Sequence, residues 1–208
     1  RIGGGEIVFD FVSPDTKITD IHLGVPVKVN IENAVAAIGA ASLSGVTHDE
    51  IRAAMKTFGG AKRRFDFQLK TPKIVFIDDY AHHPNELTAS IQSVKQLYPE
   101  KKVTGVFQPH LYTRTRDFVD EFAQSLSLLD DVVLLDIYPA REEPIPGITS
   151  EVIFDKITSK EKTLLKKAEL LEFLKNKELE VLVTLGAGDI EHLLPEIKQL
   201  LEKRFTRK

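Results

Sequence analysis

The segment Asp78–Pro84, which reads DDYAHHP, places two carboxylates, a phenol and two imidazoles next to one another. Such a loop before a helix can hold an anion or bind ribose hydroxyls. Capping of the helix predicted to begin near Pro84 would explain one of these residues but not five. We therefore interpret the segment as functional. The adjacent histidines also suggest a metal site, but the chain has no cysteine and no His-x3-His pair, and no metal ligand is assigned.

A second segment, Gln108–Asp117 (QPHLYTRTRD), carries Arg114 and Arg116 ahead of a predicted helix. Basic residues at a helix N-terminus oppose the helix dipole, so helix stability does not explain them. A guanidinium group can bind a carboxylate or phosphate through two parallel hydrogen bonds. Pairing of an exposed arginine with Asp117 or Asp120 is the alternative.

Two further loops carry weaker signals. Tyr138–Gly147 (YPAREEPIPG) is charged and stiffened by three prolines, which is typical of a functional loop, a domain contact or a rigid surface loop. Gly186–Asp189 (GAGD) would let backbone approach a ligand or another loop. The full G-x-G-x-x-G pattern is missing, so dinucleotide binding is not inferred.

The first part of the chain offers amides and basic groups. Asn30 and Asn33 stand at i and i+3 on one face of a predicted helix. An amide side chain can pair with an adenine edge, whereas a simple N-cap role for Asn30 is the alternative. Lys62, Arg63 and Arg64 could contact phosphates or solvate a linker.

These segments need strands to position them, and residues 71–208 supply a suitable pattern. Short continuous apolar runs are typical of parallel strands buried on both faces, and the first three begin about 29 residues apart, the length of a βα unit. The runs are Ile74–Ile77, Val103–Phe107, Val132–Ile137 and Val181–Leu185, with Thr163–Leu165 as a short fifth strand. We predict an α/β domain with a Rossmann-like, doubly wound, mostly parallel sheet. Ligands bind such sheets at the carboxyl ends of the strands, where the motifs lie.

Residues 1–70 are predicted to be a partial α/β unit followed by a connector. A capping box, Thr47 with Glu50, marks the start of its second helix. The expected elements are strands at Glu6–Val12 and Lys17–Leu23, helices at 31–45 and 48–57, and the connector Gly59–Lys70.

Composition excludes several classes of protein. The 208 residues carry 28 basic and 31 acidic side chains, and this net charge of −3 disfavours sequence-independent nucleic-acid binding. The absence of cysteine excludes disulfides and thiolate nucleophiles. The chain lacks an apolar run of about 18 residues, a signal peptide, a P-loop and a serine nucleophile elbow, and it begins at Arg1. We expect a cytoplasmic fragment of a longer protein, without membrane or nucleic-acid partners.

Several motifs together resemble the Mur ligase family. Asp78–Glu86, Phe107–Asp117, Tyr138–Ser150 and Thr184–Ile190 resemble its C-terminal domain. Val29–Ala37 and Gly59–Phe67 resemble the end of its central ATPase domain, so the resemblance spans nearly the whole chain.

This resemblance implies ATP-dependent amide-bond formation in peptidoglycan synthesis, a process of cell-wall biogenesis, cell shape and cell division. The motifs are most similar to those of members that add L-alanine to UDP-N-acetylmuramate through an acyl phosphate. ATP and Mg²⁺ are the implied cofactors. This chain lacks the family's N-terminal domain and most of its central domain, and the P-loop lysine and the magnesium ligands are expected in that missing part. The chain alone is therefore expected to be inactive. Members that recycle murein tripeptide, and a non-catalytic nucleotide-binding domain, are the alternatives.

The resemblance also implies roles for the nucleotide-binding residues. Asn33, with Asn30, would hold adenine, and Arg64 would contact a nucleotide phosphate. Asp79 would bind ribose, with Tyr80 beside the nucleotide.

The implied catalytic residues are His82 and Arg114. His82 would face the alanine and the acyl phosphate, and Arg114 would clamp the alanine carboxylate or the nascent phosphate, with His110 nearby. The chain departs from the family pattern at Val29, where the family often has His, and at Leu111, where it often has Arg.

Overall fold

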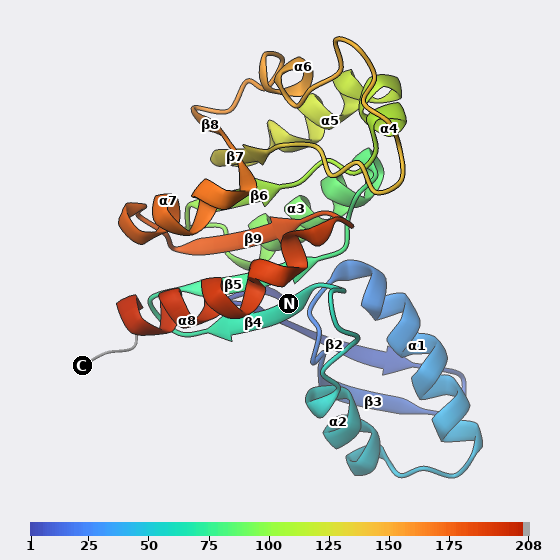
Figure 1. Ribbon diagram of the computed structural model, residues 1–208. Coiled ribbons are helices and arrows are strands. Elements are labelled where there is room, and N and C mark those ends of the chain that lie inside the picture. The colour runs from blue at the N-terminus through green and yellow to red at the C-terminus, as the bar shows by residue number, and fades with distance from the viewer. Residues whose placement is uncertain (206–208) are drawn as a thin grey trace. The chain divides into compact units, whose positions relative to one another are not determined.

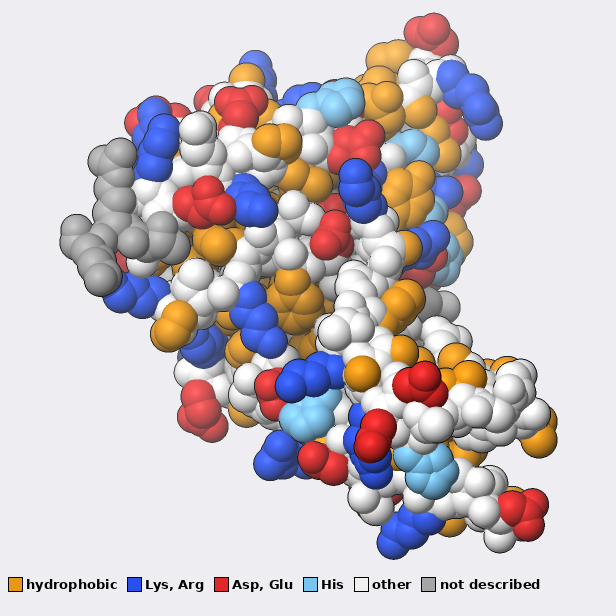
Figure 2. Space-filling view, turned by 90° about the horizontal axis from the view of Figure 1, so that it is seen from below, with side chains coloured by type: hydrophobic (Ala, Val, Ile, Leu, Met, Phe, Trp, Pro, Cys, Tyr) orange, Lys and Arg blue, Asp and Glu red, His pale blue; other side chains and the backbone are white. Residues whose placement is uncertain are grey.

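The computed structural model describes residues 1–205, which divide into two compact units. The first comprises Arg1–Lys62 with Ser93–Pro99, and the second comprises Arg63–Gln92 with the residues from Glu100 onward. Acidic and basic side chains are interspersed on the face shown in Figure 2. None of the described helices combines the length and the apolar character of a membrane span.

The first unit combines a small antiparallel sheet with two helices. The sheet has the order β1-β2-β3, and the helices follow it in the chain. The bounds are β1 (Ile2–Gly3), β2 (Glu6–Val12), β3 (Lys17–His22), α1 (Lys28–Leu43) and α2 (His48–Thr57). The two expected strands and both expected helices are confirmed, although α1 begins three residues earlier than its apolar pattern predicts. Buried isoleucines form the interior: Ile7, Ile18, Ile21, Ile38 and Ile51.

The predicted capping box forms at the start of α2. The Glu50 amide donates to Thr47 Oγ1, and the Glu50 carboxylate accepts from the Thr47 amide at 2.9 Å. Replacing Thr47 with alanine is expected to lower the free energy of unfolding by about 1 kcal/mol, because an N-terminal amide of the helix loses its acceptor. Urea denaturation would measure the loss, and a stability unchanged within about 0.3 kcal/mol would contradict it.

The second unit is built on a six-stranded sheet with the order β4-β5-β9-β6-β7-β8. All neighbouring strands are parallel except β4, which runs antiparallel to β5 at the edge. The bounds are β4 (Asp66–Lys70), β5 (Val75–Asp79), β6 (Val103–Phe107), β7 (Asp131–Leu135), β8 (Glu161–Leu165) and β9 (Val181–Leu185). The predicted doubly wound, mostly parallel α/β fold is confirmed.

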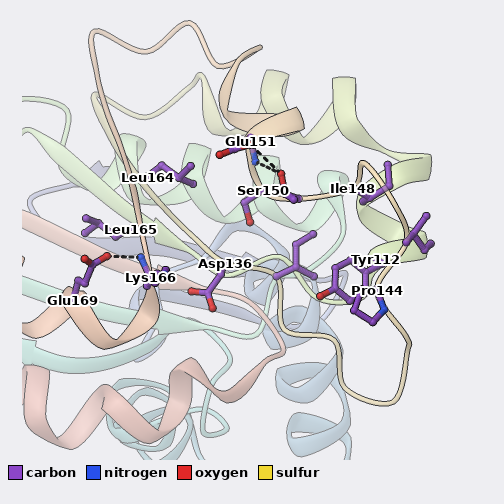
Figure 3. Close-up of a pocket in the computed structure, with 13 residues that line it drawn as sticks. Tyr112, Asp136, Pro144, Ile148, Ser150, Glu151, Leu164, Leu165, Lys166 and Glu169 are labelled. Atoms are coloured by element: carbon purple, nitrogen blue, oxygen red, sulfur yellow. Dashed lines mark hydrogen bonds between the residues drawn. The ribbon is translucent and has the colours of Figure 1, made fainter.

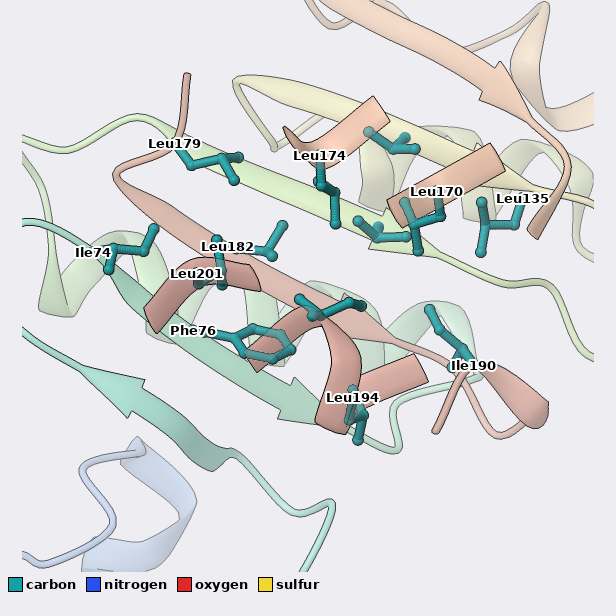
Figure 4. Close-up of a cluster of buried hydrophobic side chains, with 13 residues drawn as sticks. Ile74, Phe76, Leu135, Leu170, Leu174, Leu179, Leu182, Ile190, Leu194 and Leu201 are labelled. Atoms are coloured by element: carbon teal, nitrogen blue, oxygen red, sulfur yellow. The ribbon is translucent and has the colours of Figure 1, made fainter. Parts of the chain in front are cut away.

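Helices cover both faces of this sheet (Figure 1). One face carries α7 and α8, which bury a cluster containing Phe76, Leu182 and Ile197 (Figure 4). On the other face α5 packs against the sheet, with the rings of Phe107 and Phe122 5.4 Å apart. The helices that begin in this unit, including two 3₁₀ turns, are α3 (Pro84–Leu97), α4 (Tyr112–Asp117), α5 (Val119–Leu126), α6 (Glu151–Phe154), η1 (Lys167–Glu169), α7 (Leu170–Asn176), η2 (Asp189–Leu193) and α8 (Leu194–Phe205). The end of α3, from Ser93, belongs to the first unit.

Two features of the second unit differ from the expectation. The region expected to be a connector contains β4, which pairs with β5 from Asp66 to Lys70. The last strand along the chain, β9, lies between β5 and β6. Apolar runs identify strands buried on both faces, but they carry no information about strand order.

Candidate functional site

The predicted motifs meet at one edge of the large sheet because its central strands are parallel. Asp78 and Asp79 end β5, Gln108 follows β6, Asp136 follows β7 and Gly186 follows β9. In open α/β sheets this carboxyl edge is where ligands bind.

A buried network around Asp78 connects the ends of β5 and β9 with Arg63, which lies just before β4. The Asp78 side chain is fully buried and accepts hydrogen bonds from Thr184 Oγ1 at 2.6 Å and from Arg63 Nε at 3.2 Å. Arg63 also donates to the Gly186 carbonyl at 2.6 Å and to Glu191 at 2.8 Å. Burial raises the pKa of Asp78, and the hydrogen bond from Thr184 and the charge of Arg63 oppose this rise.

Arg63 therefore has a defined position that sequence reasoning missed. The sequence offered phosphate contact or a solvated linker for Lys62–Arg64, and nothing in it identified Asp78 as the partner. Arg63 also adopts a positive φ of 59°, which an arginine rarely does without tertiary contacts to hold it.

Three of the predicted nucleotide-binding residues gather at the end of β5. The Tyr80 ring lies 4.9 Å from the Arg63 guanidinium and 5.4 Å from that of Arg64. Burial raises the pKa of the adjacent Asp79. A carboxyl group, an aromatic ring and a guanidinium group side by side suit ribose hydroxyls and a phosphate.

The start of α3 is already occupied by a side chain of its own helix. Glu86 Oε2 accepts hydrogen bonds from the amides of His82 at 2.9 Å and His83 at 3.1 Å. Burial acts in the opposite direction, but these bonds and the neighbouring His82 leave the pKa of Glu86 lowered. A carboxylate thus occupies the amides expected to hold an anion, so an anionic ligand would need other donors.

His82, His110 and Arg114 lie together beyond the ends of β5 and β6. The ring centroids of His82 and His110 are 6.3 Å apart, and Arg114 Nη1 lies 3.2 Å from His110 Nδ1. His110 also stacks on Tyr138 at 5.7 Å. Because a guanidinium can only donate, His110 Nδ1 is the acceptor and its ring is neutral. His82 Nδ1 lies 3.0 Å from the Tyr80 carbonyl, so it carries the proton there.

The two arginines of this segment have different surroundings. Both lie within α4 rather than before it. Arg116 is exposed and pairs with Asp117 at 2.7 Å, which confirms the surface alternative for this residue. Arg114 faces the histidine cluster instead.

Burial, together with the positive charge of Arg114, lowers the pKa of His110 below its ordinary 6.5. At a pH below about 6.5 the unfolded state therefore binds more protons at His110 than the folded state does. The free energy of unfolding is thus highest above about pH 6.5 and decreases as the pH drops toward the lowered pKa of the folded state. We expect NMR titration to give His110 a midpoint below 6.5. A midpoint at or above 6.5 would contradict the contact with Arg114.

The glycines after β9 pack against Gln108 and do not line an open ligand site. A Cβ on Gly186, whose φ is 134°, would lie 2.7 Å from the Gln108 carbonyl, and one on Gly188 would lie 2.5 Å from Gln108 Oε1. Gln108 also donates to Asp189 at 2.9 Å and accepts from the Ile190 amide at 2.9 Å. Asp189 pairs in addition with Lys167. The sequence left a ligand and another loop as alternatives, and the structure selects the second.

Asn30 and Asn33 belong to the first unit. Asn33 Nδ2 donates to Asn30 Oδ1 at 3.1 Å, and Asn30 Nδ2 donates to the Val25 carbonyl at 3.1 Å. The N-cap of α1 is Val27, so the alternative of Asn30 as N-cap is wrong. The exposed Asn33 retains hydrogen-bonding capacity, since its carbonyl oxygen is not used in this pair.

A cavity of about 570 Å³ opens beside this site, at the carboxyl ends of β7 and β8 (Figure 3). Ile145, Ile148 and Leu164 give it an apolar wall, and Tyr112, Asp136 and Lys166 contribute polar groups. Nothing in the sequence pointed to this cavity. Among the described residues, no three His, Cys, Asp or Glu side chains gather as a metal site.

Comparisons with known proteins find similar sequences and a similar fold. The chain is 58% identical over 207 residues to UDP-N-acetylmuramate–L-alanine ligase of Parabacteroides distasonis, and 58% identical over 205 residues to that of Phocaeicola vulgatus. These matches cover 100% and 98% of this chain but 45% of each relative, so the chain spans about half their length. The crystal structure of UDP-N-acetylmuramate-alanine ligase from Thermotoga maritima superposes with a TM-score of 0.75 at 26% identity, covering 100% of this chain and 45% of that one.

The sequence profile described as "Mur ligase, glutamate ligase domain" matches residues 63–189. That range contains the buried pair Arg63–Asp78, the histidine cluster and the glycines after β9. The chain belongs to the Mur ligase family.

Proposed function

We propose that the full-length protein is an ATP-dependent ligase that joins L-alanine to UDP-N-acetylmuramate. The observation that most strongly supports this proposal is the cluster of His82, His110 and Arg114 at the carboxyl edge of the sheet. It lies in a chain that matches relatives of that name along its whole length.

In this proposal ATP phosphorylates the muramate carboxylate, and the alanine amine displaces phosphate from the acyl phosphate. Positioning and charge stabilisation dominate such chemistry. Arg114 binds the alanine carboxylate or the developing phosphate, and His110 orients it by accepting its N–H. His82 faces the amine and the acyl phosphate.

The predicted nucleotide-binding residues take the following roles in this proposal. Asp79 binds ribose, Tyr80 lies beside the nucleotide, and Arg64 contacts a phosphate. Asn33 and Asn30 bind adenine.

The domain boundary that we propose lies at residue 70. Residues 1–70 are the C-terminal portion of the central ATPase domain with its connector, and 71–208 are the C-terminal domain. The end of the connector, from Arg63, already belongs to the second compact unit, where β4 pairs with β5. Exposed apolar side chains on α1, namely Val29 at 62%, Val35 at 44% and Leu43 at 92%, are the kind of surface that the remainder of a domain would cover. ATP and Mg²⁺ are the cofactors. The P-loop and magnesium ligands lie in the remaining part of the full-length protein, so the 208-residue chain is inactive alone.

Phosphate release tests the proposal directly. The full-length protein, with the 208-residue chain as the matched control, is assayed with ATP, Mg²⁺, UDP-N-acetylmuramate and L-alanine. Alanine-dependent release by the long form alone is expected. Release only with murein tripeptide would assign the recycling reaction instead, and no release with either would favour a non-catalytic nucleotide-binding domain.

A further inference from the structure

Helix α4, which carries Arg114, has no cap of its own. It starts at Tyr112 after Leu111, whose φ is 75° and whose side chain cannot accept a hydrogen bond. Glu142, from the loop after β7, supplies the missing acceptor. Its Oε2 accepts from the Thr113 amide at 3.0 Å, and its Oε1 accepts from Thr113 Oγ1 at 2.5 Å.

We propose that Glu142 is a positioning residue that holds α4, and with it Arg114, in the orientation that binds the carboxylate of the incoming amino acid. This inference rests on the proposed function, because it assumes that Arg114 binds this substrate.

Backbone hydrogen bonds fix the loop that carries Glu142 against the loop that precedes α4. The Leu111 amide donates to the Tyr138 carbonyl at 3.0 Å, and the Tyr138 amide donates to the Pro109 carbonyl at 2.8 Å. The Glu142 amide closes a turn onto the Pro139 carbonyl at 2.9 Å. The loop after β7 is thereby tied to the loop after β6, and the Glu142 carboxylate is presented at the first turn of α4.

A carboxylate suits this place for two reasons. It can accept two hydrogen bonds from Thr113 at once, and its negative charge is favourable at a helix N-terminus. The hydroxyl and amide of Thr113 also hold the pKa of Glu142 below its usual range, so it stays ionised near neutral pH. Since both contacts fall on Thr113, the Arg114 guanidinium keeps donors for a substrate beyond the one used on His110.

The test uses the full-length enzyme with Glu142→Ala, Glu142→Gln and the control Glu143→Ala, an exposed neighbour. We expect Glu142→Ala to raise KM for L-alanine about tenfold and to change KM for ATP less than twofold, because only the amino-acid clamp is disturbed. Glu142→Gln, which keeps one acceptor oxygen, should have a KM for L-alanine between those of the wild type and the Glu142→Ala variant. Glu143→Ala should match wild type.

A double mutant separates positioning from a general structural effect. If Glu142 acts through Arg114, the double variant Glu142→Ala/Arg114→Ala should have nearly the same kcat/KM for L-alanine as the Arg114→Ala variant. Additive losses would overturn the proposal, as would an unchanged KM for alanine in Glu142→Ala.

Hydrogen exchange provides a readout besides activity. Glu142→Ala should speed exchange of the Thr113 amide at least tenfold in the full-length protein, whereas unchanged exchange would overturn the proposal. A wild-type enzyme that fails to use alanine would refute the proposed function and, with it, the substrate role given to Glu142. The exchange result would then show only whether Glu142 holds α4.

Discussion

Arg114→Ala in the full-length enzyme is expected to lower kcat/KM for L-alanine by about 10–150-fold. This range corresponds to a charge-assisted hydrogen bond of about 1.5–3 kcal/mol lost in the transition state. Arg114 is half-buried beside the neutral ring of His110, where its charge is less screened than on the open surface. Initial rates at varied alanine, with ATP and UDP-N-acetylmuramate saturating, would measure the loss.

Arg116→Ala is the matched control for this experiment. Arg116 lies in the same helix and carries the same charge, but it is exposed and pairs with Asp117. It should retain wild-type kcat/KM within about twofold, as is usual for surface ion pairs. Equal losses in both variants would show that the charge of the helix, rather than the placement of Arg114, matters.

Asp78→Ala should produce the largest loss of stability, about 3–5 kcal/mol in the free energy of unfolding. Removing one partner of a buried ion pair is strongly destabilising, because the other partner stays buried with its pairing lost or weakened. Here Arg63, 15% exposed, would keep only the half-exposed Glu191 as a charged partner, and Thr184 would lose the acceptor at 2.6 Å. Chemical denaturation followed by circular dichroism would measure the change.

Asp78→Asn distinguishes the charge from the hydrogen bond. An asparagine can still accept from Thr184 but offers no charge to Arg63, so a smaller loss of about 1–3 kcal/mol is expected. If Asp78→Asn were as stable as wild type, the negative charge of Asp78 would contribute nothing to the pair. If it lost as much stability as Asp78→Ala, the hydrogen bond from Thr184 would contribute nothing.

Much of the fold was predictable because strong local patterns coincide with buried elements. The run Val103–Phe107 predicts β6 to the residue, and Thr47 with Glu50 predicts the start of α2. The clustering of His82, His110 and Arg114 follows from the same reasoning, since parallel strands bring their carboxyl ends to one edge.

The remaining features depend on tertiary contacts. Strand β4 lies at an edge with half-buried side chains, so its pattern is weak, and its pairing comes from β5. Arg63 and Glu142 acquire their roles from partners 15 and 29 residues away, and neither spacing has a local signature. The roles of the nucleotide-binding and catalytic residues remain predictions.

The position of β9 has a consequence for how the protein is made. Translation delivers β4 to β8 before β9, yet the hydrogen-bonding edges of β5 and β6 stay open until Val181–Leu185 arrives to join them. A nascent chain that has emerged only as far as β8 therefore presents two unsatisfied, apolar strand edges to its surroundings. A product truncated before β9 should aggregate or be degraded. The large sheet can therefore be completed only in chains whose synthesis has continued past residue 185.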